Sequence, residues 1–188
     1  GTYGGKGGSE QYVPSIYGNA SAPTSLGSGG GNSAAGSAIK LQGDSVIIDG
    51  SVNMSGVTNG NSGSGGSIWL KANNISGSGI LNAFGGHTTT EWAGGGGRIR
   101  LEYRNSMSYT GKINLFESSP FSGKSGSLTF TNNTWPGDWN LTGNIGLLGG
   151  NYGEGNVTNV LGNFNTNGYN MTIYGDCFYN ATNPVTCY

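Results

Sequence analysis

Charge is scarce in this chain of 188 residues, because only 9% of them are charged, whereas a typical globular domain has about a quarter. The eight Lys and Arg side chains nearly balance the nine Asp and Glu side chains, and the formal net charge is -1. The cations also stand singly along the sequence, so no basic stripe suited to phosphates is visible. We therefore expect no nucleic-acid partner.

Long apolar runs and histidine are also scarce. The longest apolar runs span only a few residues, too short to cross a bilayer, and no charged-then-apolar signal sequence follows Gly1. A start at glycine instead of methionine indicates a processed or trimmed chain. His87 is the only histidine, and the two cysteines leave too few of the usual ligands for a zinc site. We expect no metal and no other cofactor.

The two cysteines, Cys177 and Cys187, lie close together in "CFYNATNPVTCY". Asn and Pro between them favour a turn, so the simple interpretation is a disulfide that closes the last loop. Such a bond would place the protein in an oxidising compartment. Two free buried thiols are the alternative.

Glycine is abundant, with 39 residues, and aromatic residues reach 11% with 4 Trp and 10 Tyr. The aromatic content and the low net charge argue against a disordered chain. A chain of this length can bury roughly 70% of its unfolded surface, so one folded core is feasible. Glycine every few residues, without an apolar stripe at helical spacing, disfavours helices.

A repeat is visible in the spacing of short alternating segments. Four of them recur every 29 to 31 residues, namely "SAIKL", "GSIWL", "GRIRL" and "GSLTF". A second set, opened by glycine, follows each of them, namely "GSVNM", "GILNA", "GKINL" and "GNIGL". Alternation of apolar and polar residues is typical of a strand with one buried face. The second set predicts equivalent inward positions for Val52, Leu81, Ile113 and Ile145.

A fixed period built from short strands predicts an all-β fold, a right-handed parallel β-helix or β-solenoid. Glycine runs such as "GGGG" before Arg98 are expected at its corners, where the backbone needs a positive φ or a close approach. Residues 1–37 are expected to form an irregular Gly/Ser-rich segment and a candidate inter-subunit contact. Residues 38–188 are expected to form the β-helix domain, with its C-terminal end closed by the disulfide.

Stacking of the repeats predicts two outward rows of side chains. One row contains Lys40, Trp69, Arg100 and Thr129, and its neighbour contains Gln42, Lys71, Glu102 and Thr131. Lys71 and Glu102 are expected to form an exposed ion pair worth a fraction of a kcal/mol. Trp69, which stands between two cations, is expected to make cation–π contacts. Surface complementarity is favoured over a binding site for both rows.

The glycine-rich order "GTYGGKGG", "GSGGSIWLKA", "ISGSGILNAFGG" and "GGGGRIRLEY" resembles the glycine-rich β-helix repeat segments of large secreted or surface proteins of bacteria, protists and plants. The resemblance covers residues from about Gly1 to Leu115. It implies an extracellular structural or surface role, and the family offers no catalytic residues to carry over.

The strongest enzymatic candidate is the loop "HTTTEWAGG", which contains His87, Glu91 and Trp92. It places titratable groups beside a ring that can stack on a sugar. The alternative is a loop whose Trp92 packs against the side of the fold while His87 and Glu91 are solvated. Asp44 and Asp49 are close in sequence, but their odd separation in a regular strand predicts opposite faces.

Sugar chemistry is indicated more strongly by N-x-[ST] sequons, in which the middle residue is not proline. The eight asparagines that begin them are Asn19, Asn53, Asn74, Asn132, Asn140, Asn156, Asn170 and Asn180. We expect covalent glycans at several of these positions if the source is eukaryotic or archaeal. Asn53 and Asn170 alternate with the inward Val52 and Met171, so both are expected to face outward.

These features predict an extracellular or cell-surface structural glycoprotein that is not an enzyme. Its expected partners are further copies of itself, joined head to tail into a glycosylated fibril. Two alternatives stay open. One is a β-helix carbohydrate-active enzyme that degrades polysaccharides, and the other is an adhesin or carbohydrate-binding module of a larger surface protein.

Overall fold

The structure is a computed structural model. It describes residues 2–4, 7, 15–87, 92–115, 123, 126–132, 139–140, 145–148, 164–165, 171–173 and 186–187. Every regular element in these ranges is a β-strand, and they contain no helix. Strand β1 begins at Ala38, and the described part of residues 1–37 carries no strand.

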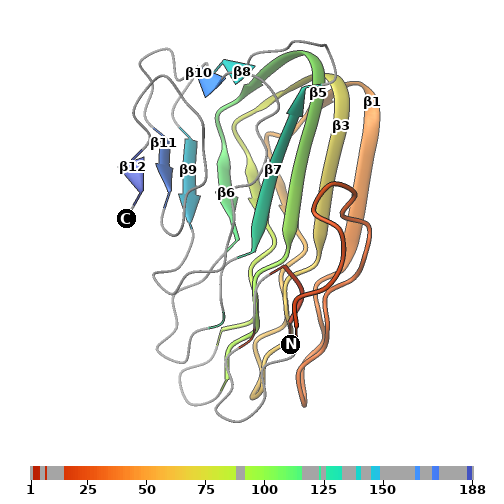
Figure 1. Cartoon of the computed structure of the whole chain (residues 1–188), viewed down its shortest axis with the longest axis vertical. Helices are drawn as coiled ribbons and strands as arrows, with labels where there is room; N and C mark the ends of the chain where they lie inside the picture. The colour runs from red at the N-terminus through yellow and green to blue at the C-terminus, as the bar shows by residue number, and fades with distance from the viewer. Residues whose placement is uncertain are drawn as a thin grey trace.

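The strands pair in parallel within separate sheets (Figure 1). The four-stranded sheet contains, in spatial order, β1 (Ala38–Ile47), β3 (Ser67–Gly77), β5 (Arg98–Tyr109) and β7 (Ser127–Asn132). The six-stranded sheet contains, in spatial order, β12 (Thr186–Cys187), β11 (Met171–Ile173), β9 (Ile145–Leu148), β6 (Lys112–Asn114), β4 (Ile80–Asn82) and β2 (Ser51–Asn53). A two-stranded sheet pairs β10 (Phe164–Asn165) with β8 (Trp139–Asn140).

The expected right-handed parallel β-helix is therefore wrong, because the strands form separate parallel sheets and not one solenoid. A sequence period determines which residues stand side by side in neighbouring strands. It does not determine whether the connecting segments form strands as well. Here the described connecting segments, residues 54–66, 83–87 and 92–97, contain no strand. Each period therefore adds one long strand to the four-stranded sheet and one short strand to the six-stranded sheet.

The register of the four-stranded sheet agrees with the repeat, since Ile39, Ile68, Ile99 and Leu128 are successive partners. In the six-stranded sheet, Val52, Leu81 and Ile113 are partners as expected. The next partner of Ile113 is Leu147, and the predicted equivalence of Ile145 is wrong. Side chains alternate along a strand, so Ile145 and Leu147, two residues apart, lie on the same face of the sheet. Alternation alone therefore cannot tell which of the two is the partner of Ile113.

One hydrophobic core draws on both large sheets. Ile68 and Leu70 of β3 are fully buried, as is Leu101 of β5. Leu81 of β4 and Ile113 of β6 belong to the same cluster and are also 0% exposed. The alternating segments therefore bury their apolar faces between the two sheets, and their polar faces point outward.

Glycines directly before the long strands allow close backbone contacts. A Cβ built on Gly97 would lie 2.0 Å from the carbonyl oxygen of Gly66, and one built on Gly126 would lie 2.0 Å from that of Gly97. Positive φ angles occur in the described residues only at Gly18, Gly60 and Gly77. The run "GGGG" is therefore needed for close approach of neighbouring chains and not for a left-handed conformation.

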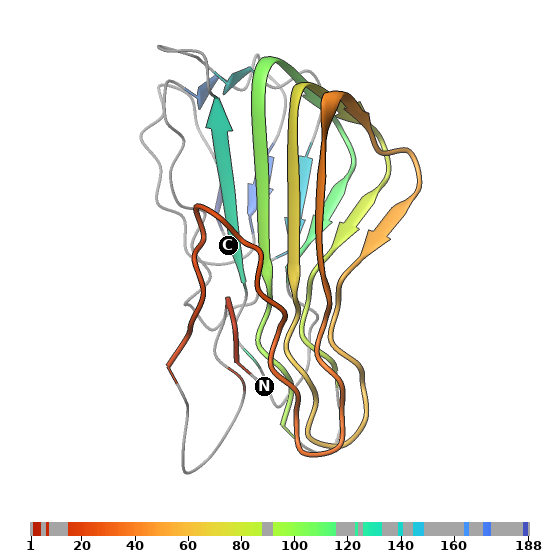
Figure 2. The same ribbon diagram turned by 90° about the vertical axis from the view of Figure 1, so that its right-hand side faces the viewer.

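The long strands bend partway along their length, and Figure 2 shows them curving over at one end. In β3 the buried apolar side chains are Ile68, Leu70 and Ala72, and then Ile75, so the alternation changes phase. The register between β3 and β5 shifts between Ala72 and Asn74. A bulge of this kind bends a strand and redirects its side chains. The outer face before the bend is the surface that carries Trp69.

Candidate functional site

The outer face of the four-stranded sheet carries the two predicted rows, and their register is confirmed. Lys40, Trp69 and Arg100 are successive partners across β1, β3 and β5. The Lys40 ammonium lies 4.0 Å from the centroid of the Trp69 ring, and the Arg100 guanidinium lies 5.1 Å from it. Both distances lie within the range of cation–π attraction, so the predicted contacts at Trp69 are confirmed.

Glu102 is the anion at the centre of this face. Its Oε1 lies 2.6 Å from Nζ of Lys71, and its Oε2 lies 3.1 Å from Nη2 of Arg100. The indole Nε1 of Trp69 donates a hydrogen bond of 3.0 Å to the same Oε2. The predicted pair of Lys71 with Glu102 is confirmed, but it is not an exposed pair, because the Glu102 side chain is only 4% exposed. Removing this carboxylate would therefore cost more than the loss of a surface ion pair.

The N-terminal segment lies across one end of this face, as the red trace shows in Figure 2. Tyr3 is 0% exposed, and its hydroxyl and that of Ser67 are 2.7 Å apart. Arg98 donates to Oγ of Ser127 at 2.9 Å and to the carbonyl oxygen of Tyr17 at 2.7 Å. Burial lowers the pKa of Arg98 from its usual value. The described part of this segment thus packs on its own chain.

Several buried polar atoms on this face have no hydrogen-bond partner among the described residues. They are Nε of Arg98, Nε of Arg100 and Oγ1 of Thr129, and each is buried. Arg100 and Thr129 are register partners on neighbouring strands. The two guanidinium groups are instead held through their terminal nitrogens, by Ser127 and the Tyr17 carbonyl for Arg98 and by Glu102 for Arg100.

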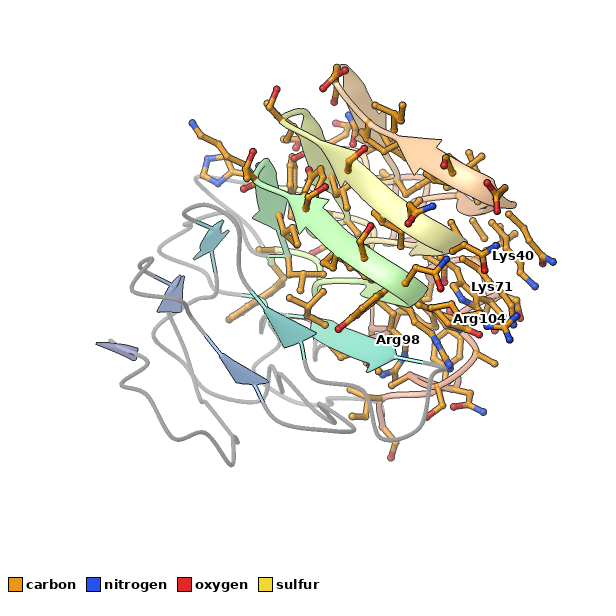
Figure 3. All side chains as sticks on the ribbon, turned by 90° about the horizontal axis from the view of Figure 1, so that it is seen from above. Lys40, Lys71, Arg98 and Arg104 are labelled. Atoms are coloured by element: carbon orange, nitrogen blue, oxygen red, sulfur yellow. The ribbon has the colours of Figure 1, made fainter. Side chains whose placement is uncertain are left out.

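Cations that stand singly in the sequence are brought together on this face. Figure 3 shows Lys40, Lys71, Arg98 and Arg104 along the same side of the four-stranded sheet, and Arg100 lies between Trp69 and Thr129 in its row. This basic surface was not predicted, because the cations are separated from one another along the chain. The signal was present in the repeat, since parallel pairing in register brings residues 29 to 31 positions apart side by side.

The acidic residues near this face are few. Oδ1 of Asp44 accepts a hydrogen bond of 2.6 Å from Nδ2 of Asn73, close to the bend. Asp49 accepts one of 3.1 Å from the backbone N–H of Ser78. The two aspartates thus have separate partners. The described residues contain no cluster of three or more His, Cys, Asp or Glu side chains able to hold a metal ion.

The candidate catalytic loop is described only in part, because Glu91 lies outside the described residues. His87 and Trp92 are both half-buried. Ser62 joins their backbones, since its N–H donates to the Trp92 carbonyl at 3.0 Å and its hydroxyl to the His87 carbonyl at 3.4 Å. Thr58 accepts from the backbone N–H of His87 at 3.0 Å.

A row of amides follows the six-stranded sheet and was not predicted. Asn53, Asn82 and Asn114 are successive register partners. Nδ2 of Asn114 donates to Oδ1 of Asn82 at 2.7 Å. Asn53 is exposed at the end of the row, and its Oδ1 accepts from the backbone N–H of Ser55 at 3.0 Å. The sequence carries the signal, because all three asparagines follow an apolar strand residue at the same repeat position.

The predicted glycosylation positions differ in how far the structure describes them. Asn19 and Asn53 are exposed, whereas Asn74 is half-buried and accepts a hydrogen bond of 2.8 Å from the Ser106 hydroxyl. Asn132 and Asn140 lie in β7 and β8. Asn156, Asn170 and Asn180 lie outside the described residues. Of the predicted disulfide, Cys187 lies in β12 and Cys177 lies outside the described residues.

Comparison of the chain with protein-family models, with curated proteins and with solved structures found no match. Among the described residues, none forms a helix long and apolar enough to cross a membrane. The geometry of the two sheets and of the basic face is therefore the basis for assigning a function.

Proposed function

We propose that the protein is an extracellular structural protein that associates with further copies of itself at the open edge formed by β1 and β2. One observation carries the proposal. Both large sheets end on one side in strands from the same short stretch of chain, β1 in the four-stranded sheet and β2 in the six-stranded sheet. This proposal assigns the protein no catalytic activity and no cofactor.

Apolar side chains at this edge are less buried than their partners in the interior strands. Ile39 is only partly buried, whereas its partner Ile68 is 0% exposed. Val52 is likewise partly buried, and its partner Leu81 is 0% exposed. An edge strand also leaves backbone N–H and C=O groups unpaired, so it offers a template for another strand. A further pair of strands would complete both the hydrogen bonds and the apolar contacts.

A second copy of the chain is the occupant that fits this edge. The opposite edges of the two sheets are β7 and β12, and every pairing within the sheets is parallel. Contact between unlike edges of two copies is head to tail, and repeated contacts that do not close into a ring build a filament. The described part of residues 1–37 packs on its own chain, so the proposal places association at the strand edges.

Ile47→Glu combined with Ser51→Glu is expected to abolish association, because it places charges on both edge strands. Ile47 is 64% exposed in β1 and Ser51 is exposed in β2, so neither substitution disturbs the core. Charged side chains on an edge strand oppose pairing with another chain. Sedimentation velocity and electron microscopy of the parent and variant proteins, at equal concentration, measure the effect.

The matched control is Ser108→Glu combined with Thr110→Glu, which adds the same charge at exposed positions in and after the interior strand β5. We expect this control to associate as the parent protein does. A parent protein that stays monomeric at high concentration would contradict the proposal, as would equal loss of association in both variants.

The proposal includes N-linked glycans at exposed sequons. Asn19 and Asn53 are expected to carry hexose-containing glycans in protein from its natural source, because both side chains are exposed. Asn74 is expected to stay bare, because it is half-buried and bound to Ser106. Glycopeptide mass spectrometry measures the occupancy of each site. Bare asparagine at both Asn19 and Asn53 would count against this part of the proposal.

A further inference from the structure

The outer face of the four-stranded sheet has an excess of positive charge that the whole chain does not have. It carries five of the six cations in the described residues, namely Lys40, Lys71, Arg98, Arg100 and Arg104. Glu102 lies among them and Asp44 lies near the bend, so the formal charge of the face is +5 - 2 = +3. The whole chain has a formal net charge of -1.

We propose that this basic face binds a linear acidic polysaccharide, a glycan chain that carries carboxylate or sulfate groups. Lys40, Lys71 and Arg104 would contact the anionic groups. Trp69 and Glu102 would hold Lys40 and Lys71 in place. The proposal does not depend on self-association, because it uses side chains on the outer face of the sheet, Lys40 of β1 among them, and not the unpaired backbone groups at the edge of β1.

Two of these three cations, Lys40 and Lys71, are held in position before any ligand arrives. Lys40 lies over the Trp69 ring, and Glu102 binds Lys71 and also Arg100. Long side chains that are already restrained lose less conformational entropy on binding. The two oxygens of Glu102 are within bonding distance of Lys71, Arg100 and Trp69, so this buried carboxylate opposes an incoming anion only weakly.

The exposed Lys40 and Arg104 and the half-buried Lys71 follow a diagonal across three strands. Lys71 lies one strand and two residues from Lys40, and Arg104 lies one strand and two residues from Lys71. Strand spacing and rise per residue place successive Cα atoms about 8 Å apart on this diagonal. A polysaccharide with one anionic group on every one or two sugar rings presents charges at comparable intervals.

Polar groups beside the diagonal suit a sugar chain. Gln42 and Asn105 are exposed, and their amides can both donate to and accept from hydroxyl groups. A nucleic acid fits less well, because binding to a duplex depends strongly on many phosphate contacts, and only Lys40, Lys71 and Arg104 on this face are open to solvent.

The test is titration of the full chain with dextran sulfate and with polygalacturonate, using neutral dextran as the uncharged comparison. We expect binding to both acidic polymers and none to neutral dextran. Lys40→Gln combined with Arg104→Gln is expected to weaken binding at least tenfold. It should also lower the slope of log K against log salt by about two units, one for each cation removed. Circular dichroism checks that the variant is folded, since both side chains are exposed.

The matched single variants are Lys40→Gln and Lys112→Gln. Both remove one exposed lysine from a strand and change the net charge equally, but Lys112 lies in β6 of the other sheet. Only Lys40→Gln should weaken binding. Equal effects of the two would show attraction by net charge alone and would overturn the proposal. Equal or tighter binding of a DNA duplex would assign the face to nucleic acid and would also overturn it.

Ile47→Glu combined with Ser51→Glu separates this proposal from self-association. The edge variant keeps Lys40, Lys71 and Arg104, so it should bind dextran sulfate within about twofold of the parent per protein chain. Binding that disappears together with association would contradict a preformed site on one chain.

Discussion

Gly97→Ala is expected to destabilise the protein by about 4 kcal/mol or more, which places it among the largest effects of single substitutions. The new methyl group would lie 2.0 Å from the carbonyl oxygen of Gly66, and that atom cannot move aside as a flexible side chain would. The Gly66 carbonyl accepts from the N–H of Arg98 at 2.8 Å, and the Gly97 carbonyl accepts from that of Ser127 at 2.9 Å. Relief of the clash would therefore pull apart the starts of neighbouring strands.

The matched control is Gly50→Ala, because a Cβ at Gly50 meets nothing within 4 Å. We expect it to change the free energy of unfolding by less than about 1 kcal/mol, and reduced freedom of the unfolded chain favours a small gain. Urea denaturation of the two variants and the parent measures the difference. Similar stability of the two alanine variants would show that the chains around Gly97 are not in close contact.

Glu102→Gln is expected to lower the free energy of unfolding by about 3 kcal/mol, at the lower end of the cost of breaking a buried ion pair. The substitution keeps an acceptor for the Trp69 indole but removes the charge that faces Lys71 and Arg100. These two cations would then stand close together on the sheet without a carboxylate between them. We chose the lower end because the Lys71 side chain is 37% exposed and its charge is partly screened.

Lys71→Gln provides the comparison for Glu102→Gln. It is expected to cost about 1 kcal/mol, because Glu102 keeps Arg100 and Trp69 as partners and the lost cation is partly solvated. Urea denaturation at low ionic strength measures both variants. If Glu102→Gln cost no more than Lys71→Gln, the carboxylate would be acting only as one half of a surface pair.

The strand pairing within the four-stranded sheet could be predicted from the sequence. The arrangement of the strands in separate sheets, instead of one solenoid, could not. Ile39, Ile68 and Ile99 recur with the period, and parallel strands in register must place them side by side. The segments between the strands have no alternation that would show whether they pair as strands. The separation into sheets follows from those segments, so the period alone led to the wrong architecture.

The electrostatics of the outer face was predictable only in part. Alternation showed that Lys71 and Glu102 share a face, and the period made them neighbours. The burial of Glu102 depends on the contacts of Trp69 and Arg100 around it, which no local pattern reveals. The cover over Arg98 is formed by Tyr3 and Tyr17, which are more than 80 residues away in sequence.

Parallel pairing at a nearly constant offset of 29 to 32 residues in the four-stranded sheet also bears on how this protein can change in evolution. Duplication of one period would add one strand to each large sheet and extend every row by one residue, without altering the contacts already present. Insertion of a fraction of a period would instead misalign all rows beyond it. Duplication of a short stretch of the gene can therefore add strands to both large sheets one period at a time. The number of cations on the basic face would change with the number of strands.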